Sequence, residues 1–223
     1  MTSTGAPRRR GRPPEAERTQ RRNAALDAAL AEIIRTGYER MTMSAVAARA
    51  GSSKESLYSW FGSKQAMVAA LIRRQSAATN AVVQQAVSSG ARPHDVLHGI
   101  ARGLLDLLTS DTSLALNRAA MSSAELAGVL LQHGRHTTGP LIEGYLARLA
   151  DDGVLALDDP AAAFGVLYGL VVQDTQIRSL LGEAPPGPEH REVQARAAVD
   201  AFLKLTAPAS LTDLAGIRSV AVD

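Results

Sequence analysis

The sequence predicts an all-α protein. Apolar residues recur at three- and four-residue spacing along nearly the whole chain, and the alternation typical of strands is nearly absent. Ser, Thr and Gly stand where the periodic segments would begin and end. The chain has 223 residues, of which 46% are hydrophobic, so it can form a real core in one large or two modest domains.

The composition excludes several classes of protein. The chain has no cysteine, which excludes disulfides, thiolate metal sites and cysteine nucleophiles. The longest apolar run, Phe164 to Val172, has nine residues, which is about half of a bilayer span. No apolar signal segment stands near the N-terminus. We therefore expect a soluble, cytoplasmic protein with no membrane partner.

Each element of the N-terminal part has a start and a stop. Residues 1–15 form a basic arm, expected to be disordered because prolines interrupt it. A first helix carries the apolar stripe from Leu26 to Ile34 and can end at Gly37. Thr42 can cap a short second helix over 43–50 that Gly51 ends, and Ser52 or Ser53 can cap a third that extends to about Trp60. Two short helices joined by a glycine turn predict a helix-turn-helix.

The stretch SSKESLYSWFGSK, residues 52–64, crowds three of the chain's eight aromatic residues into four positions. Helical spacing puts Leu57 and Phe61 on one side, where they can enter the core. The same spacing leaves polar groups such as Lys54 and Tyr58 on or beside the opposite face. A recognition helix needs this division, because its inner face fixes its angle while its outer face offers donors to phosphates and bases.

The charge is distributed unevenly. Residues 1–74 carry 14 Lys and Arg against 6 Asp and Glu, whereas residues 75–223 carry 10 against 16. A basic N-terminal part attracts polyanions, and nucleic acid is the commonest soluble one. A merely well-solvated N-terminus is the alternative explanation.

Helical patterns continue to the C-terminal part. After a junction at 88–93 we expect helices at about 94–109, 113–122, 124–132, 136–151, 160–181 and 190–206. Asp159 and Pro160 mark a helix start, and the proline-rich EAPPGPE, residues 183–189, must separate the last two long helices.

The run TMSAVAARAGSSKESLYSWFGSK, residues 42–64, resembles the helix-turn-helix signature of the tetracycline-repressor (TetR) family. The resemblance implies a dimeric, all-α, ligand-responsive transcription regulator, usually a repressor. It further implies backbone contacts and base contacts with DNA. The backbone contacts fall on Thr42, Ser53, Ser56, Tyr58, Trp60 and Lys64, and the base contacts on Ser44, Lys54, Glu55 and Ser59.

Two residues depart from the signature of the family. Ser52 stands where an apolar residue is usual, and Glu55 stands where a small one is common. Ser52 and Glu55 can form a capping box, which would turn Glu55 back towards the helix start, and we favour this reading. The alternative is that Glu55 accepts a hydrogen bond from a cytosine amino group.

The arm contains Arg-Gly-Arg-Pro, which resembles the core of an AT-hook. Such a segment inserts arginines into a narrow A·T-rich minor groove, where negative potential is concentrated. We therefore add four arginines to the predicted DNA-binding residues. They are Arg8, Arg9, Arg10 and Arg12. A generic basic tail is the competing interpretation, and the sequence leaves both open.

The resemblance also implies an effector cavity and a dimer interface in the C-terminal part. Polar or adaptable residues within apolar helices are the candidates for effector binding: Asn117, Met121, Tyr145, Tyr168, Gln173 and Asp174. The last two long helices would pair with their copies through Leu167, Leu170, Val171, Val193, Ala197 and Phe202. The expected organisation is an arm at 1–15, a helix-turn-helix domain at 16–62, a connecting long helix at 63–92, an effector-binding and dimerisation domain at 93–207, and a tail at 208–223.

Chemistry other than binding is not indicated. His94 with His98, and His133 with His136, have spacings that suit Zn²⁺, but no further ligands stand near them in sequence, so we predict no metal and no cofactor. We find no phosphate loop or nucleophile motif and expect no enzyme. The sequence thus favours a homodimeric repressor that a small-molecule effector releases from a pseudo-palindromic operator. The alternative is a constitutive architectural DNA-binding protein without an effector.

Overall fold

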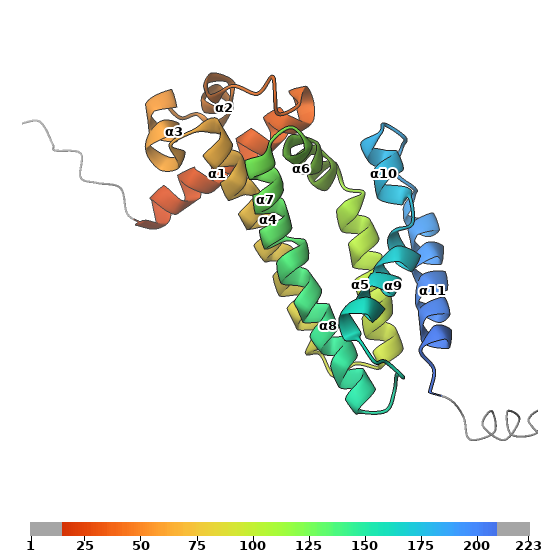
Figure 1. Cartoon of the computed structure of the whole chain (residues 1–223). Helices are drawn as coiled ribbons and strands as arrows, with labels where there is room; N and C mark the ends of the chain where they lie inside the picture. The colour runs from red at the N-terminus through yellow and green to blue at the C-terminus, as the bar shows by residue number, and fades with distance from the viewer. Residues whose placement is uncertain (1–14, 209–223) are drawn as a thin grey trace, which may run out of the picture.

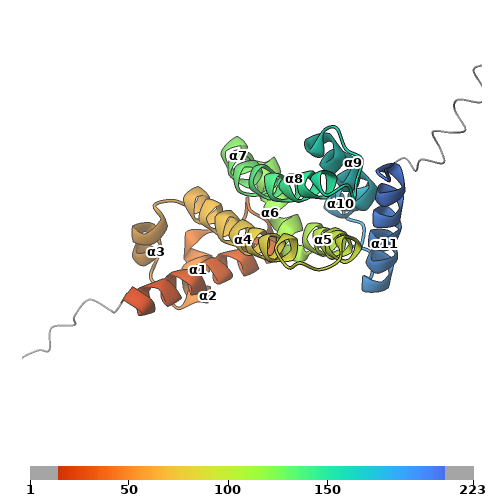
Figure 2. The ribbon, with the colours of Figure 1, turned by 90° about the horizontal axis from the view of Figure 1, so that it is seen from below.

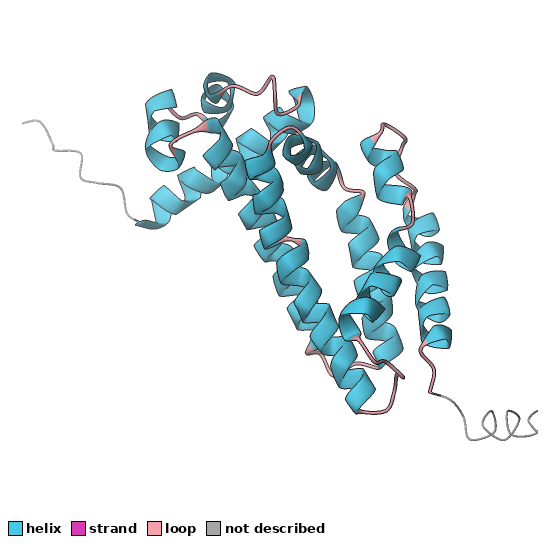
Figure 3. Ribbon diagram, in the orientation of Figure 1, coloured by secondary structure: helices cyan, strands magenta, loops and turns pink. Residues whose placement is uncertain are grey.

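Helices make up most of residues 15–208, the part of the chain that the computed structural model describes, and no strand occurs there (Figure 3). The all-α prediction is confirmed. The four N-terminal helices are α1 (Glu15–Thr36), α2 (Met43–Ala50), α3 (Lys54–Phe61) and α4 (Lys64–Val87). The remaining helices are α5 (Pro93–Leu108), α6 (Asp111–Met121), α7 (Ala124–His133), α8 (Arg135–Asp151), α9 (Pro160–Val172), α10 (Thr175–Leu180) and α11 (Pro188–Leu205).

Two hydrophobic cores organise these helices. The first joins α1, α2 and α3 to the N-terminal half of α4, and it also takes in α6 and Leu126 of α7. The second joins α5, α8, α9 and α11 around Leu97, Leu146 and Phe202. The helices α1–α3 and α11 lie at opposite ends of the molecule (Figures 1 and 2).

The long helix α4 connects the two cores. Its Met67, Val68 and Leu71 are buried in the first core, and Val87 at its end is buried in the second. Helices α7 and α8 run beside it along most of its length (Figure 1). Helix α4 is therefore packed at one end in the first core and at the other end in the second.

The single helix predicted over 160–181 is wrong, because the structure divides it into α9 and α10 at Gln173 and Asp174. Gln173 has φ 48° and ψ −129°, a backbone conformation that L-residues rarely adopt. A distant side chain bridges the break. Gln194 of α11 donates to the Val171 carbonyl at 2.8 Å and to the Thr175 hydroxyl at 3.0 Å, and Arg118 of α6 donates to the Ser179 carbonyl at the other end of α10 at 2.8 Å.

The other expected helices of the C-terminal part are present, with bounds that differ from the prediction by a few residues. The proline-rich segment separates α10 from α11, as expected. Within residues 15–208, no helix combines the length and the hydropathy that a membrane crossing requires.

Candidate nucleic-acid interface and effector cavity

Helix α3 presents two different faces, as its spacing predicts. Leu57 is fully buried and Phe61 is 8% exposed, so both lie in the first core. Lys54, Tyr58 and Ser59 are exposed on the other side. The inner face fixes the orientation of the helix, and the outer face is exposed to solvent.

Side-chain caps place the start of α3. Ser53 is the N-cap, and its hydroxyl accepts a hydrogen bond from the Ser56 amide at 3.1 Å. Of the two caps that the sequence allows, the structure uses Ser53, so the capping box of Ser52 with Glu55 is not formed. Hydrogen bonding to its own amide, and then to Ser53, lowers the pKa of the Glu55 carboxyl. Glu55 thus lies in the first turn of α3, where a negative charge is favourable.

Helix α2, which precedes α3, has a side-chain cap at its start and a glycine at its end. The Thr42 hydroxyl caps α2 by accepting from the Ala45 amide at 3.1 Å, and Ser44 in the first turn is exposed. Gly51 ends α2 in the left-handed conformation, at φ 59°. Only glycine adopts this conformation without strain, so Gly51 sets the angle between α2 and α3.

The aromatic cluster braces α3 and leaves one ring in solvent. Trp60 is half-buried and packs edge-on against Phe61, with ring centroids 6.4 Å apart. Tyr58 is 45% exposed, and the Lys54 ammonium lies 5.8 Å from the centre of its ring. The guanidinium of Arg22 in α1 lies 5.1 Å from the centre of the Phe61 ring. The sequence reasoning did not single out Arg22, which adds a positive charge beside α3.

Lys64 fastens the start of α4 to the loop between α1 and α2. Its ammonium donates to the Glu39 carbonyl at 3.1 Å and lies 4.3 Å from the centre of the Tyr38 ring. These contacts give Lys64 a structural role beside the DNA contact that the resemblance implies. Tyr38 has no motif of its own and was missed in the sequence.

A buried carboxylate also joins α1 to α2. Glu32 is only 3% exposed, and its carboxylate accepts hydrogen bonds from both Arg35 and Arg49. The hydrogen bond from Arg35 is the main cause that lowers the pKa of this carboxyl, and Arg49 contributes in the same direction. Because Arg49 belongs to α2, the pair fixes α2 against α1.

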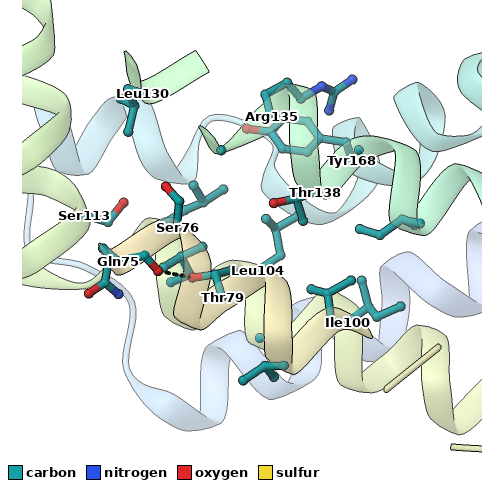
Figure 4. Close-up of a pocket in the computed structure, with 18 of the residues that line it drawn as sticks. Gln75, Ser76, Thr79, Ile100, Leu104, Ser113, Leu130, Arg135, Thr138 and Tyr168 are labelled. Atoms are coloured by element: carbon teal, nitrogen blue, oxygen red, sulfur yellow. Dashed lines mark hydrogen bonds between the residues drawn. The ribbon is translucent and has the colours of Figure 1, made fainter. Parts of the chain in front are cut away.

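Helices α4 to α10 surround a cavity of about 460 Å³ (Figure 4). Most of its wall is aliphatic or glycine. The neutral polar side chains that line it are Gln75, Ser76, Thr79, Ser113, Asn117, Thr138 and Gln176. Its volume and its mainly apolar wall with few polar groups are typical of a small-molecule site.

Tyr168 and Arg135 lie together on one wall of this cavity (Figure 4). The guanidinium of Arg135 lies 4.5 Å from the centre of the Phe164 ring and 5.1 Å from that of Tyr168. Burial raises the pKa of the Tyr168 hydroxyl, and the Arg135 charge opposes this shift. The hydroxyl therefore stays protonated at neutral pH and can donate a hydrogen bond.

Two of the six predicted effector residues line the cavity, namely Asn117 and Tyr168. The other four do not. Met121 is 66% exposed, Gln173 and Asp174 form the exposed break between α9 and α10, and Tyr145 is buried in the second core. The sequence reasoning missed the polar residues of α4 and α8, because it treated α4 only as a connector.

The predicted dimer residues divide into two groups. Leu167, Val171 and Phe202 are at most 2% exposed and lie within the chain's own core, so the expectation that they meet a partner is corrected. Val193 and Ala197 on α11 are exposed, and Leu170 on α9 is partly buried. An exposed residue beside them, Val166 of α9, extends this apolar face.

Two of the four histidines with zinc-like spacing, His94 and His98, face carboxylates. His94 lies 3.3 Å from an Asp200 oxygen, and His98 lies 3.1 Å from a Glu192 oxygen. Glu192 also accepts from Arg102 at 2.7 Å, which joins α5 to α11. In the described part of the chain, no group of three His, Asp or Glu side chains is placed to hold a metal ion. The predicted DNA-binding arginines Arg8, Arg9, Arg10 and Arg12 lie outside the described residues.

The fold and these sites define a helix-turn-helix DNA-binding protein with a cavity-bearing helical second domain. Residues 25–71 match the family described as "Bacterial regulatory proteins, tetR family", and residues 95–205 match the "AefR-like transcriptional repressor, C-terminal domain". The chain belongs to the TetR family of transcriptional regulators.

Individual relatives agree with this assignment. The chain is 30% identical over 141 residues to the HTH-type transcriptional repressor KstR of Mycolicibacterium smegmatis, a match that covers 62% of this chain and 67% of that protein. A TetR transcriptional regulator from Agrobacterium tumefaciens is 36% identical, with a TM-score of 0.67 over 83% of this chain and 94% of that one. The flavonoid-responsive regulator FrrA is 26% identical, with a TM-score of 0.65 over 86% of this chain and all of that one.

Proposed function

We propose that the protein is a homodimeric repressor that leaves a pseudo-palindromic operator when a small molecule occupies its cavity. One observation carries this proposal. Ile72 of α4 and Leu116 of α6 line the cavity, and both also belong to the core that holds α1, α2 and α3. A ligand that moves either side chain therefore acts directly on the packing of the DNA-binding domain.

The proposed DNA interface is the outward face of α3 together with the caps of α2 and α3. Tyr58, Ser59 and Lys54 supply exposed donors there, and the basic N-terminal part supplies attraction to phosphates. The proposed base-reading residues are Ser44, Lys54 and Ser59. Glu55 is engaged at the helix start, which supports its role as a cap.

The proposed dimer contact is the exposed apolar face of α9 and α11. Val166 is 48% exposed and Val193 is 68% exposed, although both are large apolar residues. A second copy of the chain would cover this face and place two recognition helices on successive turns of DNA. Val193→Glu should yield a folded monomer in sedimentation, whereas Val154→Glu, an exposed control outside α9 and α11, should leave the dimer intact. A dimeric Val193→Glu protein would place the interface elsewhere.

Selection of binding sites from a random DNA pool tests the operator. A repressor should enrich one pseudo-palindromic sequence and bind it about a thousandfold or more tightly than random DNA. A pool without enrichment would favour the alternative, a constitutive architectural protein.

A cavity-filling variant tests the effector. Gly103 of α5 lines the cavity, and a Cβ built there has no neighbour within 4 Å, so Gly103→Leu fills the cavity without a clash at that carbon. This variant should bind the operator but no longer respond to compounds that release the wild type. Gly144→Leu, on an open part of α8 outside the cavity, is the matched control and should still respond. Release of both variants alike would mean that the effector binds outside the cavity.

A further inference from the structure

The single formal charge on the cavity wall is positive. Among the residues that line it, Arg135 is the one ionised side chain, and no Asp, Glu or Lys is present. A cationic ligand would therefore meet a like charge without a counter-charge, whereas an anionic ligand would find an opposite charge.

Arg135 is not engaged by the protein in the way that other arginines are. Arg102 and Arg191 pair with carboxylates at 2.7 Å and 2.6 Å. Within residues 15–208, no carboxylate forms an ion pair with Arg135 and no oxygen accepts a hydrogen bond from it, while its guanidinium lies over the Phe164 and Tyr168 rings. Arg135 is exposed, so the five donors of its guanidinium lie at the rim of the cavity, where a carboxylate can accept two of them at once.

The break between α7 and α8 fixes this position. Gly134 ends α7 and starts α8, and a Cβ there would lie 2.7 Å from the Leu130 carbonyl oxygen. Glycine thus allows the helix to be interrupted here, and Arg135 follows as the first residue of α8. On the facing helix, Asn80 of α4 donates to the His133 carbonyl and accepts from Thr138, which fixes the junction against α4.

The cavity is long and its polarity is graded. Its wall includes α4 from Ile72 to Ala86, which corresponds to about 21 Å along the helix. The neutral polar groups Gln75, Ser76 and Asn117 lie towards the DNA-binding domain. The distal wall is apolar and includes Val83, Ile100 and Ile142. A ligand with a polar head and a long apolar body fits this gradient.

We propose that the effector is an extended amphipathic carboxylate whose head pairs with Arg135 and whose apolar body occupies the distal part of the cavity. This inference rests on the proposed function, because it identifies the ligand of the same cavity.

The test compares three probes with the same alkyl chain, namely decanoate, decanol and decyltrimethylammonium, by calorimetry on the full-length protein. The wild type should bind decanoate at least tenfold more tightly than decanol, which corresponds to about 1.4 kcal/mol, and should bind the cation least. Arg135→Gln should lose this preference to within about twofold while its affinity for decanol is unchanged. Arg73→Gln, an exposed arginine of α4 outside the cavity, should behave as the wild type.

Equal affinity of the wild type for decanoate and decanol would overturn the carboxylate assignment, as would a preference that survives in Arg135→Gln. Absence of binding by all three probes would overturn the amphipathic class. A second experiment measures whether decanoate releases the protein from operator DNA. If decanoate binds with the expected preference but the protein stays on DNA, the ligand class stands and release by such a ligand fails. If decanoate does not bind but other compounds release DNA through the cavity, the function stands and the ligand class fails.

Discussion

Replacement of Leu57 by alanine tests the inner face of the recognition helix. Leu57 is fully buried in the first core, between α1, α2 and α4. Truncation to alanine removes three carbons, which costs about 2.4 kcal/mol of transfer free energy at roughly 0.8 kcal/mol per carbon. The cavity that remains adds a further cost, so we expect a loss of about 3 to 4 kcal/mol from the free energy of unfolding.

The assay uses the only tryptophan of the chain. Trp60 lies in α3 itself, so its fluorescence during urea unfolding follows the DNA-binding domain, and circular dichroism follows the whole chain. With a urea dependence of about 1 to 3 kcal/mol/M, the expected loss lowers the fluorescence midpoint by about 1 to 4 M. Protein concentration must be held constant, because the stability of a dimer depends on it.

The matched control is the same substitution at an exposed leucine. Leu181 is 81% exposed, so Leu181→Ala should change the free energy of unfolding by less than about 0.5 kcal/mol. If Leu57→Ala unfolds at the wild-type midpoint by fluorescence, the inward and outward faces of α3 are assigned wrongly. The proposed set of DNA-contacting residues would then be wrong as well, because it depends on that assignment.

Three further substitutions test separate parts of the molecule. Tyr58→Phe should weaken binding to every DNA by about 0.5 to 1.5 kcal/mol in fluorescence anisotropy, because it removes one phosphate-binding hydroxyl; a loss on one operator variant alone would indicate base reading. Glu32→Gln should lower the thermal midpoint at neutral pH, and the difference from wild type should shrink as the pH falls below the ordinary glutamate pKa of about 4.3 and through the lowered pKa of Glu32. The lowered pKa of Glu32 is the reason, since a carboxyl with a lowered pKa stabilises the fold above its ordinary pKa and loses this effect as acid protonates it; a difference that persists in acid would contradict the ion pair. Gln173→Gly should raise stability by about 1 kcal/mol by relieving the positive φ of 48°, and an unchanged melting temperature would show that the turn is unstrained.

The helix-turn-helix could be predicted from the sequence because its signals are local. The Thr42 hydroxyl caps α2 by accepting a hydrogen bond from an amide only three residues further along the chain. Gly51 ends α2 through its own backbone conformation alone. The alternation of buried Leu57 with exposed Tyr58 likewise follows from helical geometry alone. Such signals operate within one turn, so a single sequence contains them.

The break at Gln173 could not be predicted, because nothing local demands it. No glycine or proline interrupts the helical pattern there, and the side chain that bridges the break, Gln194, comes from α11. Tertiary contacts outweigh the local preference for a continuous helix. The same reason explains the ion pair of Glu32 with Arg49, which joins residues 17 positions apart.

The cavity was the least predictable part of the site. Asn117 and Tyr168 attracted notice as polar groups on apolar helices, but a polar group on α4 is expected on any partly exposed helix. Whether Gln75 and Thr79 face solvent or a cavity depends on where α5, α6 and α8 pack, and no residue of α4 encodes that. The same ambiguity misplaced Leu167, Val171 and Phe202, since apolar spacing is identical for a helix packed in its own subunit and for one packed against a partner.

The length of α4 means that a small tilt of this helix is enough for the proposed release from DNA. Its 24 residues span about 36 Å, so a tilt of roughly 5° about one end displaces the other by about 3 Å. Recognition helices of a dimer must match half-sites about 34 to 36 Å apart, and base contacts require hydrogen-bond distances, so a displacement of this size in each subunit is enough to disrupt them. The ligand needs to prefer the tilted state by only a few kcal/mol, because a difference of about 2.7 kcal/mol already shifts the ratio of the two states a hundredfold. A cavity wall that shares Ile72 and Leu116 with the DNA-binding core gives a bound molecule direct access to that equilibrium.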